Sequence, residues 1–127
     1  MKLRQAVLSD CRNIYIWRNH ELNRKYSHNS TIIPYKQHRE WFAKNYEGLF
    51  IGYERNPIGV IRFVNSLISI YLVPGYHGNG YGKKLLQAAI VYHGKPIKAE
   101  ILPDNIASIK IFEACGFKEK EGVWYYV

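Results

Sequence analysis

The sequence has little cysteine and no long apolar run. Its two cysteines, Cys11 and Cys115, form neither a CxxC pair nor a metal-ligand spacing, so it predicts no disulfide framework and no metal site. No apolar segment approaches the roughly 20 residues that a membrane-spanning helix needs. The first residues also lack the apolar region of a signal peptide. These absences exclude a disulfide scaffold and an integral membrane protein, and they predict a cytoplasmic location.

Acidic residues are scarce as well. The chain has 10 Asp and Glu against 18 Lys and Arg, which gives a formal net charge of +8. A basic surface attracts polyanions such as nucleic acid, the ribosome or a highly phosphorylated cofactor, and the charge alone does not choose among them. The 11 tyrosines could stack on single-stranded nucleic acid or could belong to strands and a substrate cleft.

The 127 residues, 47% of them apolar, predict a single domain over residues 1–127. Hydrophobic periodicity predicts helices at 11–19, 35–46, 82–92 and 105–115, with a loop or short helix at 21–34. It predicts strands at 2–7, 49–55, 58–64, 67–73 and 97–102, and one or two closing strands within 117–127. An antiparallel meander followed by β-α-β units indicates an α/β (α+β) protein whose mixed sheet has helices on both faces.

The most informative segment is a glycine-rich loop between a predicted strand and a predicted helix. Its glycines are Gly75, Gly78, Gly80 and Gly82. Glycine allows φ > 0 and a close approach of the backbone to a ligand, and a helix N-terminus presents unpaired N–H groups. The segment therefore predicts a binding site for a phosphate or pyrophosphate.

The spacing of these glycines does not match the best-known phosphate-binding motifs. Gly75 and Gly80 have the spacing of a Walker loop, but Tyr81-Gly82 stand where Lys-Ser/Thr is required. Gly78, Gly80 and Gly82 do not have the spacing of the dinucleotide fingerprint. A loop that only reverses the chain is the remaining alternative to phosphate binding.

Two blocks in combination resemble the GNAT superfamily of acetyl-CoA-dependent N-acetyltransferases. The segment HGNGYG (residues 77–82) is similar to the pyrophosphate loop of that superfamily, Gln/Arg-x-x-Gly-x-Gly/Ala. The segment NIASIKIFEACGF (residues 105–117) is similar to its Asn-x-x-Ser-x-x-x-Tyr/Phe-x-x-x-Gly-Phe pattern. The resemblance implies a GNAT-like fold, with a mostly antiparallel central sheet and a splayed strand pair.

The resemblance also implies acetyl-CoA as co-substrate. Its pantetheine arm would lie between the strand ending at Leu72 and Val73 and the strand at 97–102, and backbone N–H groups of the loop would hold the pyrophosphate. The implied cofactor-binding residues are Leu72, Val73, His77, Gly78, Asn79, Gly80, Tyr81, Gly82, Asn105, Ser108 and Phe112. Asn105 is also expected as a helix N-cap, and Ser108 as an ordinary helix residue.

Two positions depart from the family pattern. His77 replaces Gln or Arg, which predicts weaker or pH-sensitive cofactor binding. Phe112 stands where many members have a tyrosine that protonates the departing thiolate, and a phenylalanine cannot donate a proton. That role would pass to water, to no group, or to another tyrosine, of which Tyr71 is our candidate because it precedes Leu72.

Acetylation of an amine requires a group that takes the proton of the amine. Glu100, on the strand expected beside the cofactor, is the predicted catalytic base, and Glu54 is the reserve candidate. The alternative is that Glu100 faces solvent or forms a salt bridge. A strand N–H near Leu72 would stabilise the developing charge on the carbonyl oxygen.

The N-terminal half is expected to bind the acceptor. Trp17-Arg18-Asn19, with HREWF at 38–42, resembles family members that acetylate the 4-amino group of UDP-linked deoxysugars. The Trp-Arg-Asn pattern also occurs in relatives that modify ribosomal-protein N-termini. An arginine can pair with a diphosphate or carboxylate, and aromatic rings can stack on a sugar or uracil. Trp17, Arg18 and Asn19 are therefore the predicted acceptor residues, with core packing as the alternative for the aromatic ones.

Four functions are left open by the sequence. The first is acetylation of a small-molecule amine or amino-sugar nucleotide, and the second is acetylation of a protein N-terminus. The third is a non-catalytic acetyl-CoA-binding module, which Phe112 suggests. Nucleic-acid binding is ranked last, and no membrane partner is expected.

Overall fold

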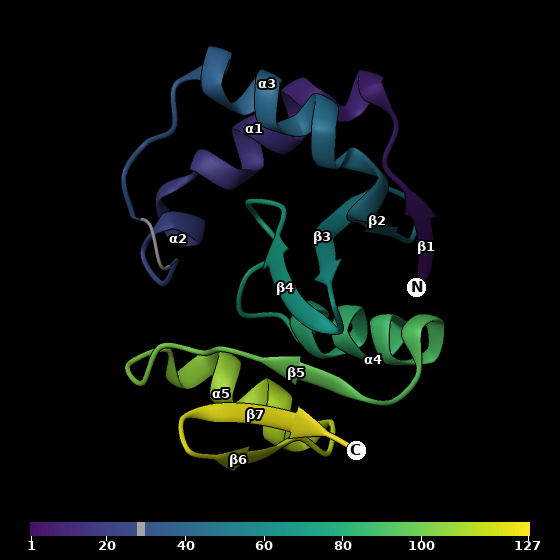
Figure 1. Cartoon of the computed structure of the whole chain (residues 1–127), viewed down its shortest axis with the longest axis vertical. Coiled ribbons are helices and arrows are strands. Elements are labelled where there is room, and N and C mark those ends of the chain that lie inside the picture. The colour runs from purple at the N-terminus through teal and green to yellow at the C-terminus, as the bar shows by residue number, and fades with distance from the viewer. Residues whose placement is uncertain (28–29) are drawn as a thin grey trace.

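The computed structural model describes residues 1–27 and 30–127 (Figure 1). The described residues form one seven-stranded sheet with the order β1-β2-β3-β4-β5-β7-β6. Neighbouring strands are antiparallel except β4 and β5, which are parallel. The strands are β1 (Lys2–Gln5), β2 (Leu49–Tyr53), β3 (Pro57–Val64), β4 (Leu67–Leu72), β5 (Ile97–Ala99), β6 (Lys118–Lys120) and β7 (Val123–Tyr126).

Helices lie on both faces of this sheet, as the sequence predicted. They are α1 (Cys11–Asn19), α2 (Glu21–Arg24), α3 (Tyr35–Asn45), α4 (Tyr81–His93) and α5 (Ile106–Ala114), with 3-10 turns η1 (Leu8–Asp10) and η2 (Tyr46–Gly48). In Figure 1, α1 and α3 lie together at the top of the view, and α4 and α5 lie below. The predicted helices are confirmed, and the segment 21–34 contains the short helix α2.

Two hydrophobic clusters occupy the two faces. Ile14 of α1 and Phe42 of α3 pack on Val60 of β3, and all three side chains are at most 1% exposed. Leu85 of α4 belongs to the second cluster, with Ile61 and others from β4, β5 and α5. Because successive strand residues point to opposite faces, Val60 and Ile61 mark the two sides of the sheet. We call them the α1/α3 face and the α4/α5 face.

Glycines in the strands let α4 lie close to the sheet. A Cβ atom at Gly52 of β2 or Gly59 of β3 would collide with the side chain of Leu85. Leu85 is fully buried, so it could not move aside without opening the core. The two glycines therefore fix the helix whose N-terminus follows the glycine-rich loop.

The two parallel strands separate soon after they meet. Their one register pair is Leu67 with Lys98, and the Lys98 N–H donates to the Ser66 carbonyl at 2.9 Å. β4 then continues to Leu72, whereas β5 ends at Ala99. The splayed pair expected from the sequence is confirmed, although β5 is shorter than the predicted 97–102. We call the space between residues 68–72 and the segment after Ala99 the gap.

Candidate cofactor and acceptor site

The glycine-rich loop presents free backbone N–H groups at the start of α4. Gly75, Gly78 and Gly80 have φ values of +99°, +79° and +81°, which L side chains rarely adopt. Gly80 is the N-cap of α4 and supplies no capping side chain. Among the described residues, the N–H groups from 77 to 83 donate no hydrogen bond within the protein. Unpaired N–H groups at a helix N-terminus fit a pyrophosphate.

Main-chain groups of β4 face the gap in alternation. The Val73 N–H donates to the Ile58 carbonyl at 2.8 Å, and the Val73 carbonyl accepts from the Tyr76 N–H at 3.1 Å. Alternation along the strand therefore turns the N–H and C=O of Leu72 toward the gap. The expectation for Leu72 is compatible with this geometry. The N–H of Val73 is not free for a cofactor, because it already donates to β3, so the contact of Val73 with the cofactor stays a prediction.

Asn23 of α2 joins the end of α1 and the end of β4 to the glycine-rich loop, a role that no sequence pattern indicated. Its Nδ2 donates to the carbonyl oxygens of Trp17 at 2.7 Å and Leu72 at 2.8 Å. Its Oδ1 lies 3.1 Å from Nε2 of His77, at the start of the loop. Because an amide oxygen only accepts, Nε2 of His77 carries the proton.

The other ring nitrogen of His77 has no partner. Its Nδ1 is buried without a hydrogen bond among the described residues. Burial lowers the pKa of His77, and the nearby His20 lowers it further. A neutral imidazole with an unused Nδ1 therefore lies at the start of the loop, where the family pattern has Gln or Arg.

The α5 residues expected at the cofactor have ordinary structural contacts. Oδ1 of Asn105 accepts from the Ser108 N–H at 3.2 Å, so Asn105 is the N-cap of α5. Phe112 is 5% exposed and packs edge-on against Phe117, with 4.8 Å between ring centroids. The ring of Phe112 thus lies in the α4/α5 core and offers almost no surface to a ligand. Its contact with the cofactor stays a prediction.

Tyr71 and Glu100 lie on the same face of the sheet. Leu67 and Lys98 are register partners, so residues at even spacings from them, including Tyr71 and Glu100, share their side. This is the α1/α3 face, because Tyr71 packs against its hydrophobic cluster. Glu100 is exposed. Burial raises the pKa of the Tyr71 phenol above its usual range, and Arg18 lowers it by a smaller amount, so the phenol stays protonated.

Glu54 does not belong to this site. It follows β2, which β3 separates from β4, and its carboxylate lies 3.7 Å from the N-terminal amine of Met1. The reserve prediction for the base is therefore wrong.

The three predicted acceptor residues differ in their contacts. Trp17 packs against the α1/α3 cluster. Asn19 fastens the end of α1 to the segment before α3: its Oδ1 accepts from the Ile33 N–H at 2.9 Å, and its Nδ2 donates to the carbonyl oxygens of Tyr15 and Ile33 at 3.2 and 3.4 Å. Asn19 therefore has a structural role in the fold. Its contact with an acceptor stays a prediction.

Arg18 is held on the α1/α3 face by His38 and Trp41. Its Nη1 lies 3.4 Å from Nδ1 of His38, and its Cζ lies 4.7 Å from the centroid of the Trp41 ring. Nε2 of His38 lies 3.0 Å from the Cys11 carbonyl, so Nε2 is the protonated nitrogen and Nδ1 accepts from Arg18. Arg62 of β3 approaches the same Trp41 ring at 5.0 Å.

A splayed pair of parallel strands beside a loop of free N–H groups at a helix N-terminus is the arrangement expected of an acyl-CoA-dependent transferase. The model of the Acetyltransferase (GNAT) family matches residues 12–117. The chain belongs to this family. It is an acetyl-CoA-dependent N-acetyltransferase, and acetyl-CoA is its co-substrate.

Solved structures share this fold. Spermidine N-acetyltransferase from Vibrio cholerae, in complex with CoA and spermine, has a TM-score of 0.82 at 18% identity, over 98% of this chain and 92% of that chain. The Salmonella typhimurium protein yncA, with its cofactor acetyl-CoA, has a TM-score of 0.73 at 23% identity. The match covers 98% of this chain and 91% of that chain. Aminoglycoside acetyltransferase AAC(6')-Ib, with coenzyme A and kanamycin, has a TM-score of 0.77 at 18% identity. The match covers 98% of this chain and 91% of that chain.

One comparison and two structural features are negative. No curated protein matches this chain at a significant level. Within residues 1–27 and 30–127, no helix is both long enough and apolar enough to cross a membrane. The same residues contain no group of three or more His, Cys, Asp or Glu placed to hold a metal ion.

Proposed function

We propose that this chain transfers the acetyl group of acetyl-CoA to a primary amine on a small, negatively charged acceptor. The acceptor we infer is a nucleotide-linked deoxy-amino sugar, acetylated at its 4-amino group. The observation that supports this choice is the charge of the α1/α3 face beside the gap, where the amine would arrive.

Positively charged side chains predominate on this face. Arg62 lies two residues from Val60 on β3 and Lys98 is the partner of Leu67, so both share the face with Arg18 of α1. Glu100 is the carboxylate that we place beside them. Such a face attracts an anion and repels a polycation. Spermine and kanamycin, the ligands in two of the similar structures, are polyamines, whereas a nucleotide-linked sugar carries a diphosphate.

The residues around the gap have complementary roles in the proposed reaction. Acetyl-CoA supplies the acetyl thioester. The Leu72 N–H, directed into the gap, would donate to the carbonyl oxygen as negative charge develops there. Glu100 would accept the proton of the amine directly or through an ordered water. As the amine nitrogen bonds to the carbonyl carbon, the C–S bond would break and CoA would leave as a thiolate. The Tyr71 phenol, protonated and half-buried, would donate a hydrogen bond to that thiolate.

The test is mass spectrometry of an acceptor pool after incubation with acetyl-CoA. The pool contains a UDP-4-amino-4-deoxysugar, its non-nucleotide amino sugar, spermidine, kanamycin and short peptides with free N-termini. We expect acetylation of the UDP-linked sugar, with much less of the free sugar. Acetylation of a peptide would support a protein N-terminal acetyltransferase, and acetylation of spermidine would contradict an anionic acceptor. Binding of acetyl-CoA without any product would favour a non-catalytic module.

A further inference from the structure

We propose that Arg18, Trp41 and Arg62 form an anion subsite that binds the phosphate groups of the acceptor. This inference rests on the proposed function only in assigning the anion to the acceptor. Arg62 was not among the predicted acceptor residues. It places a second guanidinium group at the Trp41 ring, beside that of Arg18.

Two guanidinium groups converge on one aromatic ring. The Cζ atoms of Arg18 and Arg62 lie 4.7 and 5.0 Å from the centroid of the Trp41 ring. An indole face attracts a guanidinium, but two cations at one ring also repel each other. An anion bound between them would remove that repulsion and would accept hydrogen bonds from both planar forks.

Neither arginine has an acidic partner among the described residues. The salt bridges there involve Arg4 with Asp10 and the N-terminal amine with Glu54. Partly buried charges in proteins are usually paired. Arg18 is half-buried, and its side chain donates to the neutral nitrogen Nδ1 of His38. The paired acid that a partly buried arginine normally has is therefore missing, and a ligand would supply it.

The electrostatic surroundings of Arg18 agree with this interpretation. Burial lowers the pKa of Arg18, the Tyr71 phenol raises it, and Arg62 lowers it again. An arginine nevertheless keeps its charge in a protein. His38, fully buried and bonded to the Cys11 carbonyl, keeps the guanidinium directed at Trp41. Arg18 is therefore held in place before a ligand binds, which lowers the entropic cost of binding.

The position of the subsite suits an amine attached to a phosphorylated sugar. Arg62 is the register partner of Ser69, and Leu72 lies three residues further along β4, a rise of about 10 Å. One pyranose ring with its attached phosphate bridges a separation of this order. An amine near the Leu72 N–H would thus place the phosphate near Arg62.

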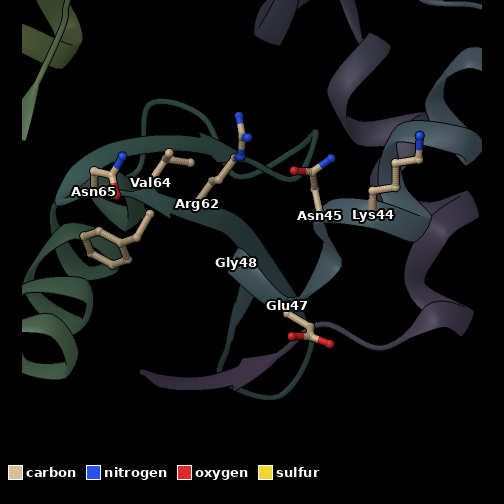
Figure 2. A pocket seen from close by; sticks show the side chains of 8 residues that line it. Lys44, Asn45, Glu47, Gly48, Arg62, Val64 and Asn65 are labelled. Atoms are coloured by element: carbon tan, nitrogen blue, oxygen red, sulfur yellow. The ribbon is translucent and has the colours of Figure 1, made fainter.

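A pocket continues beyond Arg62 (Figure 2). It has a volume of about 330 Å³ and lies between the end of α3 and the β3–β4 turn. In this view Arg62 lies between Asn45 on one side and Asn65 on the other, and all three line the pocket. The amide side chains of Asn45 and Asn65 offer both donors and acceptors, so this pocket would bind the nucleoside part of the acceptor.

The test is a titration of intrinsic tryptophan fluorescence with UDP, inorganic pyrophosphate and uridine. Saturating CoA is present throughout, so that the pyrophosphate loop cannot bind the probe. We expect UDP and pyrophosphate to change the fluorescence, uridine to do so much less, and the signal to disappear in Trp41→Phe. The dissociation constant for UDP should rise about tenfold to a hundredfold in Arg62→Gln and in Arg18→Gln.

Two further variants keep the result interpretable. Arg12→Gln removes one exposed arginine from the start of α1, six residues before Arg18, and it should leave UDP binding unchanged. Arg62→Lys keeps the charge but loses the fork, and its affinity should fall between those of the wild type and Arg62→Gln. Equal UDP affinity in the wild type and Arg62→Gln, or no UDP binding to the wild type, would overturn the subsite. UDP binding without acetylation of the UDP-linked sugar would keep the subsite and reject the proposed acceptor.

Discussion

Asn23 accepts a hydrogen bond from Nε2 of His77 over 3.1 Å, and this bond connects α2 to the glycine-rich loop. The same Asn23 side chain donates to the carbonyl oxygen of Leu72, the last residue of β4, at 2.8 Å. One amide thus fixes the loop that would hold the pyrophosphate relative to the strand that would hold the pantetheine arm. The position of both groups should depend on Asn23.

Replacing Asn23 should weaken cofactor binding more than it weakens the fold. Asn23→Ala removes the bonds to His77 and Leu72, and we expect the dissociation constant for acetyl-CoA to rise about tenfold, measured by calorimetry on folded protein. The control is Gln5→Ala, at the end of β1. It also removes a side-chain hydrogen bond to a backbone carbonyl, the one that Nε2 of Gln5 donates to Glu47 at 2.7 Å. Equal acetyl-CoA affinity in the two variants would show that Asn23 only supports the fold.

His77 should make cofactor binding depend on pH. Burial holds its pKa below the ordinary value near 6.5, so the ring is neutral at pH 7 and gains a proton only in more acidic solution. A protonated ring would offer its Nδ1–H to the pyrophosphate, so acetyl-CoA affinity should rise as the pH falls through the His77 pKa. His77→Gln cannot titrate. We expect its affinity to change less between pH 5 and pH 7 than that of the wild type, and identical profiles would contradict this role.

The sequence indicated the parts of the site that local patterns encode. The gap and the loop could be predicted because their signals are local. The strand periodicity and the glycines Gly78 and Gly80 follow one another within a short segment. Asn23 could not be predicted, because it lies in a stretch without periodicity. Its partners Leu72 and His77 are 49 and 54 residues away in the sequence. Arg62 had a usable signal: it is an arginine inside an otherwise apolar strand, and alternation from Val60 places it on the α1/α3 face.

The backbone conformation of Gly80 should matter for binding as well as for folding. Its φ of +81° disfavours any L side chain, and an added Cβ would meet nothing within 4 Å, so Gly80→Ala adds strain without a clash. We expect a loss of about 1–2 kcal/mol of stability in thermal unfolding. The shifted N–H groups should also weaken acetyl-CoA binding.

Gly122→Ala provides the matched control for Gly80→Ala. Gly122 has a φ of +83° and equally open space, but it lies in the turn between β6 and β7. The two variants should lose similar stability, and Gly80→Ala alone should lose affinity for acetyl-CoA. Equal affinities would mean that the loop does not hold the pyrophosphate through its backbone.

Glu100 should affect turnover and leave cofactor affinity unchanged. Glu100→Gln removes the carboxylate beside the gap, and we expect kcat to fall about 100-fold to 10,000-fold, the range for losing a general base. Because an amine loses its proton without help as the pH rises, the defect should shrink in alkaline solution. Glu113→Gln, which removes an exposed carboxylate from α5, should behave like the wild type. If Glu100→Gln keeps its turnover at every pH, a water or the acceptor itself disposes of the proton, and the face beside the gap contributes charge but no base.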